Sequence, residues 1–456
     1  MTKHKENVKE LQKLEQIFVS LQLCKKKHMR QLIVVIALLQ IAIGLRAQIA
    51  RDEIRKDIHY SASNYLAYPL PRQMRLTPAP SGKKPFYLSH YGRHGSRYLT
   101  GQDDYDFPCQ VLAKADSAGK LTPLGKDVLR RVTLMRGEAD NRFGELTQLG
   151  ARQHQRIAKR MYEHFPEIFE GEVTVNAKST TVIRCMLSME YALLQLISMN
   201  PHLRVIHDAS KFDMWYMNYQ DKALRSQRMD STTQAVYDAF KKKYDKSELL
   251  MERLFNDQSY VKEQVDVWKL AIILFDLASN LQSSELHKKM TLYDLFSDEE
   301  VYNYWKITNA WWYINYGGYT LNGGKQPYSQ RMLLRRIIQE ADSCIQLERP
   351  GATLRFGHDT MVLPLTCLLE LDGYGLQTDN LESLERKGWL NYKIFPMGAN
   401  VQFVFYRKDL QDKDVWVKVL LNESETVLPV RSNTEPYYKW SDVRDYYLRK
   451  LDAYQD

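Results

Sequence analysis

The strand-like segments of this chain lie towards its two ends and are almost absent from its middle. Between residues 210 and 342 the apolar residues follow helical spacing instead, most clearly over 262–282 and 329–341. Short runs rich in β-branched or aromatic residues occupy 85–89, 173–175, 352–356, 401–406 and 415–421. A sheet built from both ends of a chain leaves the helical middle as an insertion.

The sequence therefore predicts a discontinuous α/β sandwich domain, with a mostly parallel sheet and flanking helices, that carries an inserted helical cap. We place the α/β domain at residues 49–205 and 343–456, and the cap at residues 206–342. Within the α/β part, Thr147 is expected to cap a helix over 146–165.

The first 48 residues have the composition of an export signal. A basic run over 25–30 precedes an apolar stretch over 32–45, which ends in Arg46-Ala47-Gln48. About 14 apolar residues are too few to span a bilayer as a helix. We expect a signal peptide that is cleaved near Ala47, with Met29 as the start of translation, and an exported, periplasmic or secreted protein without stable membrane insertion. An anchor that stays uncleaved is the alternative.

The excess of positive charge belongs mostly to this first segment. The chain has 64 Lys and Arg against 55 Asp and Glu, a formal net charge of +9. Residues 1–48 hold nine of the basic and three of the acidic residues, which leaves +3 for the rest. The net charge therefore gives little support for a general polyanion-binding surface, and we expect no nucleic-acid partner.

Cysteine usage does not point to a metal centre. Cleavage of the signal peptide would leave four cysteines, and an even number is common in proteins of an oxidising compartment. Four cysteines allow three pairings, and the sequence selects none of them. No pair has Cys-x-x-Cys spacing, and no cluster of His or carboxylates has metal spacing, so we expect no metal and no cofactor. The four cysteines are Cys109, Cys185, Cys344 and Cys367.

The run Arg93-His94-Gly95-Ser96-Arg97 directly follows the strand predicted at 85–89. A strand that ends in a Gly-containing loop is where α/β proteins place their chemistry. Two guanidiniums around such a loop can face one anion, and Gly95 lets the backbone approach it. The imidazole of His94, largely neutral at pH 7, is then a candidate nucleophile toward phosphorus. A basic surface loop with an incidental histidine is the alternative.

Further segments follow in the order Leu146-Thr147-Gln148-Leu149-Gly150, Arg184 with Ser188, Gly357-His358-Asp359 and Leu420-Leu421-Asn422-Glu423. With the first motif, they resemble the acid-phosphatase and phytase branch of the histidine phosphatase superfamily over most of the chain after the first segment. The sequence of residues 93–100 and the pair Arg184-Cys185 are most similar to those of the multiple inositol polyphosphate phosphatases. Those enzymes usually carry His-Ala-Glu where this chain has His358-Asp359-Thr360, as phytases and general acid phosphatases do, so the substrate stays open.

The resemblance implies a metal-free phosphomonoesterase in which His94 attacks phosphorus and Asp359 protonates the leaving alcohol. The expected substrates are small phosphomonoesters, with inositol polyphosphates such as phytate first. The alternatives are a general acid phosphatase on sugar or nucleotide phosphates, a phosphomutase, and a non-catalytic phospholigand-binding protein. The residues that the resemblance assigns to the phosphoryl oxygens are Arg93, Arg97, Arg184 and His358.

The general acid has a second candidate, because His207-Asp208 repeats the dipeptide. We assign the acid to Asp359 because the strand at 352–356 leads into it and a helix begins just after it, and such a junction offers backbone N–H groups to an anion. A polyphosphorylated substrate also needs cations at the rim of the pocket. The candidates for this rim are Lys178, Lys222 and Arg225.

Overall fold

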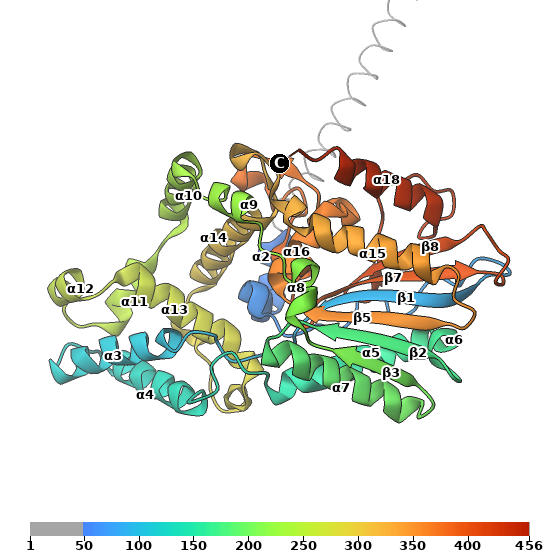
Figure 1. Ribbon diagram of the computed structural model, residues 1–456. Helices are drawn as coiled ribbons and strands as arrows, with labels where there is room; N and C mark the ends of the chain where they lie inside the picture. The colour runs from blue at the N-terminus through green and yellow to red at the C-terminus, as the bar shows by residue number, and fades with distance from the viewer. Residues whose placement is uncertain (1–48, 456) are drawn as a thin grey trace, which may run out of the picture.

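One mixed sheet organises residues 49–455, the part of the chain that the computed structural model describes (Figure 1). Its strand order is β10-β8-β7-β1-β5-β2-β3, and β9 pairs with β8. The parallel half consists of β1 (Lys84–Arg93), β5 (Gly351–Gly357), β2 (Thr174–Ser179) and β3 (Arg204–Asp208). The antiparallel half consists of β7 (Asn400–Arg407), β8 (Trp416–Leu421), β9 (Ser424–Glu425) and β10 (Tyr438–Lys439). The predicted α/β fold, with a sheet assembled from both ends of the chain, is confirmed.

Helices cover both faces of this sheet, because its central strands are apolar on both sides. On one face, Leu88, Val175 and Leu354 share a core with α5 (Gln148–His164), α6 (Pro166–Phe169) and α7 (Ile183–Met199). On the other face, Tyr87 and Phe403 pack against α15 (Arg331–Cys344), α16 (Asp359–Leu368) and α18 (Trp440–Asp452). A small parallel pair, β4 (Gly318–Tyr319) and β6 (Gln377–Thr378), lies outside the main sheet.

The helical part has a hydrophobic core of its own. In it α3 (Asp103–Ser117) and α4 (Pro123–Glu138) pack with α11 (Ser247–Leu254), α13 (Val267–Asn280) and the first half of α14 (Asp298–Tyr316). The cap bounds 206–342 stay a prediction, but this helical core also draws on residues 103–138, and α15 packs on the sheet. The other helices are α2 (Ile49–Lys56), α8 (Met214–Met217), α9 (Lys222–Gln227), α10 (Ser231–Tyr244), α12 (Gln258–Gln264) and α17 (Asn391–Ile394).

Short 3-10 helices connect several of these elements. They are η1 (Ile58–Tyr65), η2 (Lys211–Asp213), η3 (Leu281–Ser283), η4 (Glu285–Lys288), η5 (Tyr293–Leu295), η6 (Thr320–Asn322), η7 (Gln326–Gln330), η8 (Leu371–Gly373) and η9 (Leu381–Ser383). Of these, η1 matters for the site, because it brings Asn64 and Tyr65 to the end of β1.

Side-chain caps decide where two of the predicted helices begin. Thr147 caps α5 as expected, since its hydroxyl accepts a hydrogen bond from the backbone N–H of Gly150. The helix expected over 262–282 is instead two helices. The Asp266 carboxylate accepts from the backbone N–H of Lys269 and starts α13 afresh, after α12 has ended at Gln264.

Between residues 49 and 455, no helix is long and apolar enough to cross a membrane. The expected signal peptide, its cleavage near Ala47 and the start at Met29 lie outside the described residues.

The four cysteines of the described chain are free thiols. Cys185 and Cys367 are buried, while Cys109 and Cys344 are half-buried. The Cys185 Sγ lies 3.2 Å from the carbonyl oxygen of Gly357, next to the histidines discussed below. The sequence selected no pairing, and the structure contains none among these four residues.

Candidate active site

Two histidines meet where β1 and β5 end side by side. The two strands are parallel neighbours, with Arg93 opposite Gly357, so the residues that follow them reach the same edge of the sheet. The backbone N–H of His94 donates to the carbonyl of Gly357 at 2.9 Å. The rings of His94 and His358 lie 5.9 Å apart between centroids. The tertiary structure thus unites two sequence-predicted residues that are far apart in the chain.

The His94 ring is held so that one nitrogen keeps a free lone pair. Its Nδ1 lies 2.9 Å from the carbonyl oxygen of Gly95. Because a carbonyl can only accept, Nδ1 carries the proton and Nε2 is the unprotonated nitrogen. Burial, together with the charges of Arg93 and Arg184, holds the pKa of His94 well below its usual range. The ring is therefore neutral well into acidic pH, as a nucleophile must be.

The guanidiniums of Arg93, Arg97 and Arg184 surround these histidines. Arg93 is fully buried and donates to the carbonyls of Asn64 at 2.6 Å and Phe395 at 2.8 Å. Each of the three arginines has a buried Nε that finds no hydrogen-bond partner within residues 49–455. Buried donors are nearly always satisfied, so three such groups around one histidine indicate a place for an anion with several oxygens.

Asp359 is a carboxylate in the free protein. Its Oδ2 lies 2.8 Å from Arg93, and its Oδ1 accepts from the backbone N–H of Thr360 in the first turn of α16. Burial raises the pKa of Asp359, but Arg93 and Arg97 outweigh this effect, and the net pKa lies below the usual value.

His358 immediately precedes the same helix and is also neutral. Burial and the charge of Arg184 lower its pKa to about 4. Its Nε2 lies 3.1 Å from the hydroxyl of Thr180, which follows β2. All six residues assigned to phosphate chemistry therefore gather at one end of the parallel strands.

The loop after β1 is positioned by residues of α5 that the sequence motif only partly revealed. A Cβ at Gly95 would lie 2.5 Å from the carbonyl oxygen of Gly150, and a Cβ at Gly150 would lie 2.3 Å from that of Ser96. Only glycine permits this approach at both positions. Gln153 then accepts from the backbone N–H of Ser96 at 2.8 Å. Sequence reasoning missed Gln153, although it stands one helical turn after Gly150.

Ser188 connects the loop to α7. Its hydroxyl accepts from the backbone N–H of Gly95 at 3.1 Å and donates to the carbonyl of Arg184 at 2.7 Å. The spacing of Arg184 and Ser188 in the sequence thus corresponds to one turn of a helix that touches the loop after β1.

The second His-Asp pair lies elsewhere. His207 and Asp208 end the edge strand β3. Two strands, β5 and β2, lie between β3 and β1, so β3 is about 14 Å from β1 at the usual strand spacing. His207 is exposed and pairs with Glu190 at 2.8 Å. The structure places Asp359, and not Asp208, beside Arg93.

The rim candidates differ in their surroundings. Lys178 is the penultimate residue of β2 but pairs with Asp213 at 2.9 Å, whereas Lys222 and Arg225 are exposed on α9. Sequence reasoning missed Arg228, just after that helix. Its guanidinium lies 4.2 Å from the centre of the Tyr316 ring. Burial raises the pKa of Tyr316, and the charges of Arg228 and Asp359 both act on the ring.

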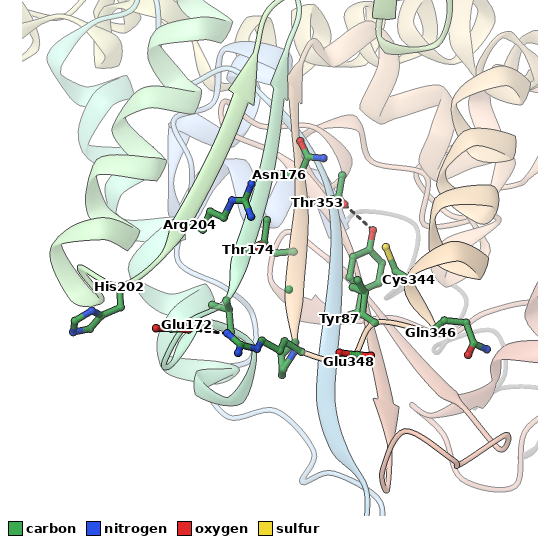
Figure 2. Close-up of a pocket in the computed structure, with 16 residues that line it drawn as sticks. Tyr87, Glu172, Thr174, Asn176, His202, Arg204, Cys344, Gln346, Glu348 and Thr353 are labelled. Carbon is green, nitrogen blue, oxygen red and sulfur yellow. Dashed lines mark hydrogen bonds and ion pairs between the residues drawn. The ribbon is translucent and has the colours of Figure 1, made fainter.

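A groove of about 800 Å³ lies at the opposite ends of the same strands (Figure 2). It is lined by the first residues of β2, β3 and β5, including Thr174, Arg204 and Thr353. The histidine and arginine cluster lies at the other ends of these strands, so this groove is separate from that cluster.

Comparison with known proteins places this geometry in context. The family model of the histidine phosphatase superfamily (branch 2) matches residues 92–422 of the sequence. Multiple inositol polyphosphate phosphatase 1 of Gallus gallus is 21% identical over 388 residues, which cover 81% of this chain and 82% of that protein.

Solved structures share the fold. The Bifidobacterium longum multiple inositol polyphosphate phosphatase in complex with inositol hexasulfate superposes with a TM-score of 0.71 at 17% identity, covering 85% of this chain and 97% of the other. The phytase from D. castellii superposes with a TM-score of 0.63 at 14% identity, covering 87% and 86%.

Proposed function

The chain belongs to the histidine phosphatase superfamily (branch 2), and from this premise we propose that it is a phosphomonoesterase that acts through a phosphohistidine at His94. One observation carries the proposal. His94 is buried and neutral, with Nδ1–H bound to Gly95 and Nε2 free, among three guanidiniums that retain unpaired buried N–H groups. This arrangement suits attack on a bound phosphoryl group better than any role as a surface loop.

The proposed reaction has two displacements. The Nε2 lone pair of His94 forms a bond to phosphorus as the ester P–O bond breaks, and the leaving oxygen takes a proton from Asp359. Water then attacks the phosphohistidine, gives its proton to Asp359, and releases phosphate with His94 restored. Arg93, Arg97 and Arg184, with His358, stabilise the charge on the phosphoryl oxygens during both steps.

Asp359 must gain a proton before it can act as the acid. A bound phosphate ester adds negative charge beside it and competes for the guanidinium of Arg93, and both effects raise the pKa of Asp359. A monoanionic ester, the form that prevails in acid, supplies the proton. We therefore propose an enzyme that works best at acidic pH.

We further propose inositol polyphosphates such as phytate as substrates, and export as the route by which the enzyme meets them. The curated relative and the Bifidobacterium longum enzyme are inositol polyphosphate phosphatases by name. Arg228, Arg225 and the exposed Lys222 offer cations beyond the catalytic cluster. A general acid phosphatase on sugar or nucleotide phosphates is the second candidate, because this chain has His358-Asp359-Thr360 where the inositol polyphosphate phosphatases usually carry His-Ala-Glu.

Measurement of free phosphate from a panel of esters tests the function directly. Inositol hexakisphosphate, glucose 6-phosphate and a nucleotide should be compared at equal concentration and acidic pH. We expect phosphate from all that bind and the highest kcat/KM for inositol hexakisphosphate. Transfer between sugars without free phosphate would indicate a phosphomutase, and tight binding without turnover a binding protein.

Arg228→Ala is expected to raise KM for inositol hexakisphosphate about tenfold, which corresponds to the loss of one charge-assisted hydrogen bond. The same change should alter KM for p-nitrophenyl phosphate less than about twofold, because its single phosphate occupies the Arg93 cluster. Arg349→Ala, an exposed arginine at the opposite ends of the strands, is the matched control. An equal change for both substrates would contradict a rim role for Arg228.

The neutral state of His94 predicts how kcat/KM for p-nitrophenyl phosphate depends on pH. A histidine of pKa about 6.5 would be only about 3% neutral at pH 5 and would lose activity about thirtyfold between pH 7.5 and 5. Because burial and the guanidiniums lower the pKa of His94, its neutral form persists and this loss should be absent. A pH–rate profile, corrected for ionisation of the substrate, checks this. An acidic limb near pH 6.5 would argue against the assigned state of the ring.

A further inference from the structure

A row of large apolar side chains lies exposed on α7. The side chains of Ile183, Leu187, Leu194 and Ile197 are between 38% and 62% exposed. With Glu190 they follow one another at intervals of four, three, four and three residues, which places all five on one seam of the helix. The opposite side of α7 packs on the sheet through Ala192 and Leu196, so this seam is a second apolar face.

The strand next to this helix is an open edge of the sheet. In the described residues β3 pairs with β2 alone (Figure 1). The backbone N–H of Arg204 donates to Val173 on the β2 side. Since alternate residues of a strand direct their backbone groups to the same side, Ile206 and Asp208 also face β2, whereas Val205 and His207 direct theirs outward. Such an edge can pair with another strand, and β3 carries no proline or bulge to prevent it.

The sequence of β3 is complementary to itself in the antiparallel direction. If a second copy pairs about Ile206, Val205 lies opposite His207 of that copy, and these are the two residues with outward backbone groups. Arg204 then lies opposite Asp208 of the second copy, so opposite charges meet at two symmetry-related positions. Ile206, which is 46% exposed, meets its own equivalent at the centre.

The seam of α7 has the same symmetry. Antiparallel pairing about Glu190 places Ile183 against Ile197 and Leu187 against Leu194 of the second copy. Glu190 lies 2.8 Å from His207, the neighbour of Ile206 in β3. The centre of the helix seam therefore lies beside the centre of the strand, and one twofold axis can serve both.

We propose that the protein forms a twofold-symmetric homodimer in which the two β3 edges join antiparallel into one continuous sheet and the two α7 seams pack across the axis. The occupant of this surface is a second copy of the chain because the charges of β3 and the apolar residues of α7 are self-complementary. The two Glu190 side chains that meet at the axis each lie 2.8 Å from His207 of their own copy. Arg204, which also lines the groove of Figure 2, is then a contact of the dimer. The proposal does not depend on the catalytic function.

Charge exchange within β3 tests the register. Sedimentation equilibrium of the purified chain should give twice the monomer mass. Arg204→Asp or Asp208→Arg alone places like charges opposite each other twice and should raise the dimer dissociation constant about tenfold or more. The double variant Arg204→Asp with Asp208→Arg restores the pairs and should recover the dimer.

Two controls keep the test decisive. Arg335→Asp changes an ion pair with Asp452 between α15 and α18, on the other face of the sheet, and should leave the dimer intact. Leu194→Glu places a charge in the α7 seam and should give a monomer with unchanged melting temperature in dilute solution, because this side chain is exposed. A wild-type chain that stays monomeric at about 100 µM, well above the Kd of a stable dimer, overturns the proposal, as does a double variant that fails to recover association.

Discussion

Replacement of His94 by Ala is expected to abolish hydrolysis of every phosphomonoester, including p-nitrophenyl phosphate. Without the imidazole no phosphoenzyme can form, and removal of a covalent nucleophile costs on the order of 10⁴-fold or more in kcat. The phosphate pocket should remain, since Arg93, Arg97 and Arg184 are held by other contacts. Binding of inositol hexakisphosphate to the variant should therefore be detectable and should weaken with added salt.

Trapping provides the direct measurement for this variant. Acid quench of the wild type with ³²P-labelled ester should leave label that is acid-labile and alkali-stable, as a phosphohistidine is, and His94→Ala should leave none. His202→Ala, an exposed histidine at the opposite ends of the strands, is the matched control and should label normally. Normal labelling of His94→Ala would show that another residue is the nucleophile.

The second large effect is expected from Asp359→Asn, and it should depend on the leaving group. An inositol alkoxide is a poor leaving group and needs a proton, whereas nitrophenolate departs without one. General acid catalysis contributes about 10² to 10⁴-fold, so this loss should appear with inositol and other alkyl phosphates and be mostly absent with p-nitrophenyl phosphate. Asn keeps the shape of Asp359 and can still accept a hydrogen bond from Arg93.

A comparison of the two His-Asp pairs completes this test. Asp208→Asn should leave the activity on both substrates unchanged, because Asp208 lies at the sheet edge, two strands away from β5. If Asp359→Asn reduced both activities equally, Asp359 would act by positioning Arg93 rather than by donating a proton. If Asp208→Asn alone gave the selective loss, the assignment of the acid would be wrong.

The elements around the nucleophile were predictable because they are coded locally. The strand that ends at Arg93 contains the apolar run 85–88, and the helix after Thr147 has both its cap and its periodicity within a few residues. The strand that leads to His358 was recognisable for the same reason. Short-range patterns of this kind survive in any tertiary context that buries them.

Contacts between distant segments were not predictable in the same way. Gln153 supports the loop only because α5 packs against it, and Arg228 meets the Tyr316 ring only because the segment after α9 packs against α14. The helical core combines α3 and α4 with helices more than a hundred residues later in the chain. No periodicity within one segment can show which other segment it will meet.

The sequence by itself determined the class of fold and the family, and it predicted the nucleophile motif and the order of the proposed phosphate-binding residues. Each of these depends on residue types at fixed short spacing. The tertiary structure decided that Asp359 rather than Asp208 lies beside Arg93, and that His94 is neutral with Nε2 free. Both depend on burial and on charges contributed by strands and helices that are remote in the chain, because desolvation and Coulomb energy follow distance in space and not separation in sequence.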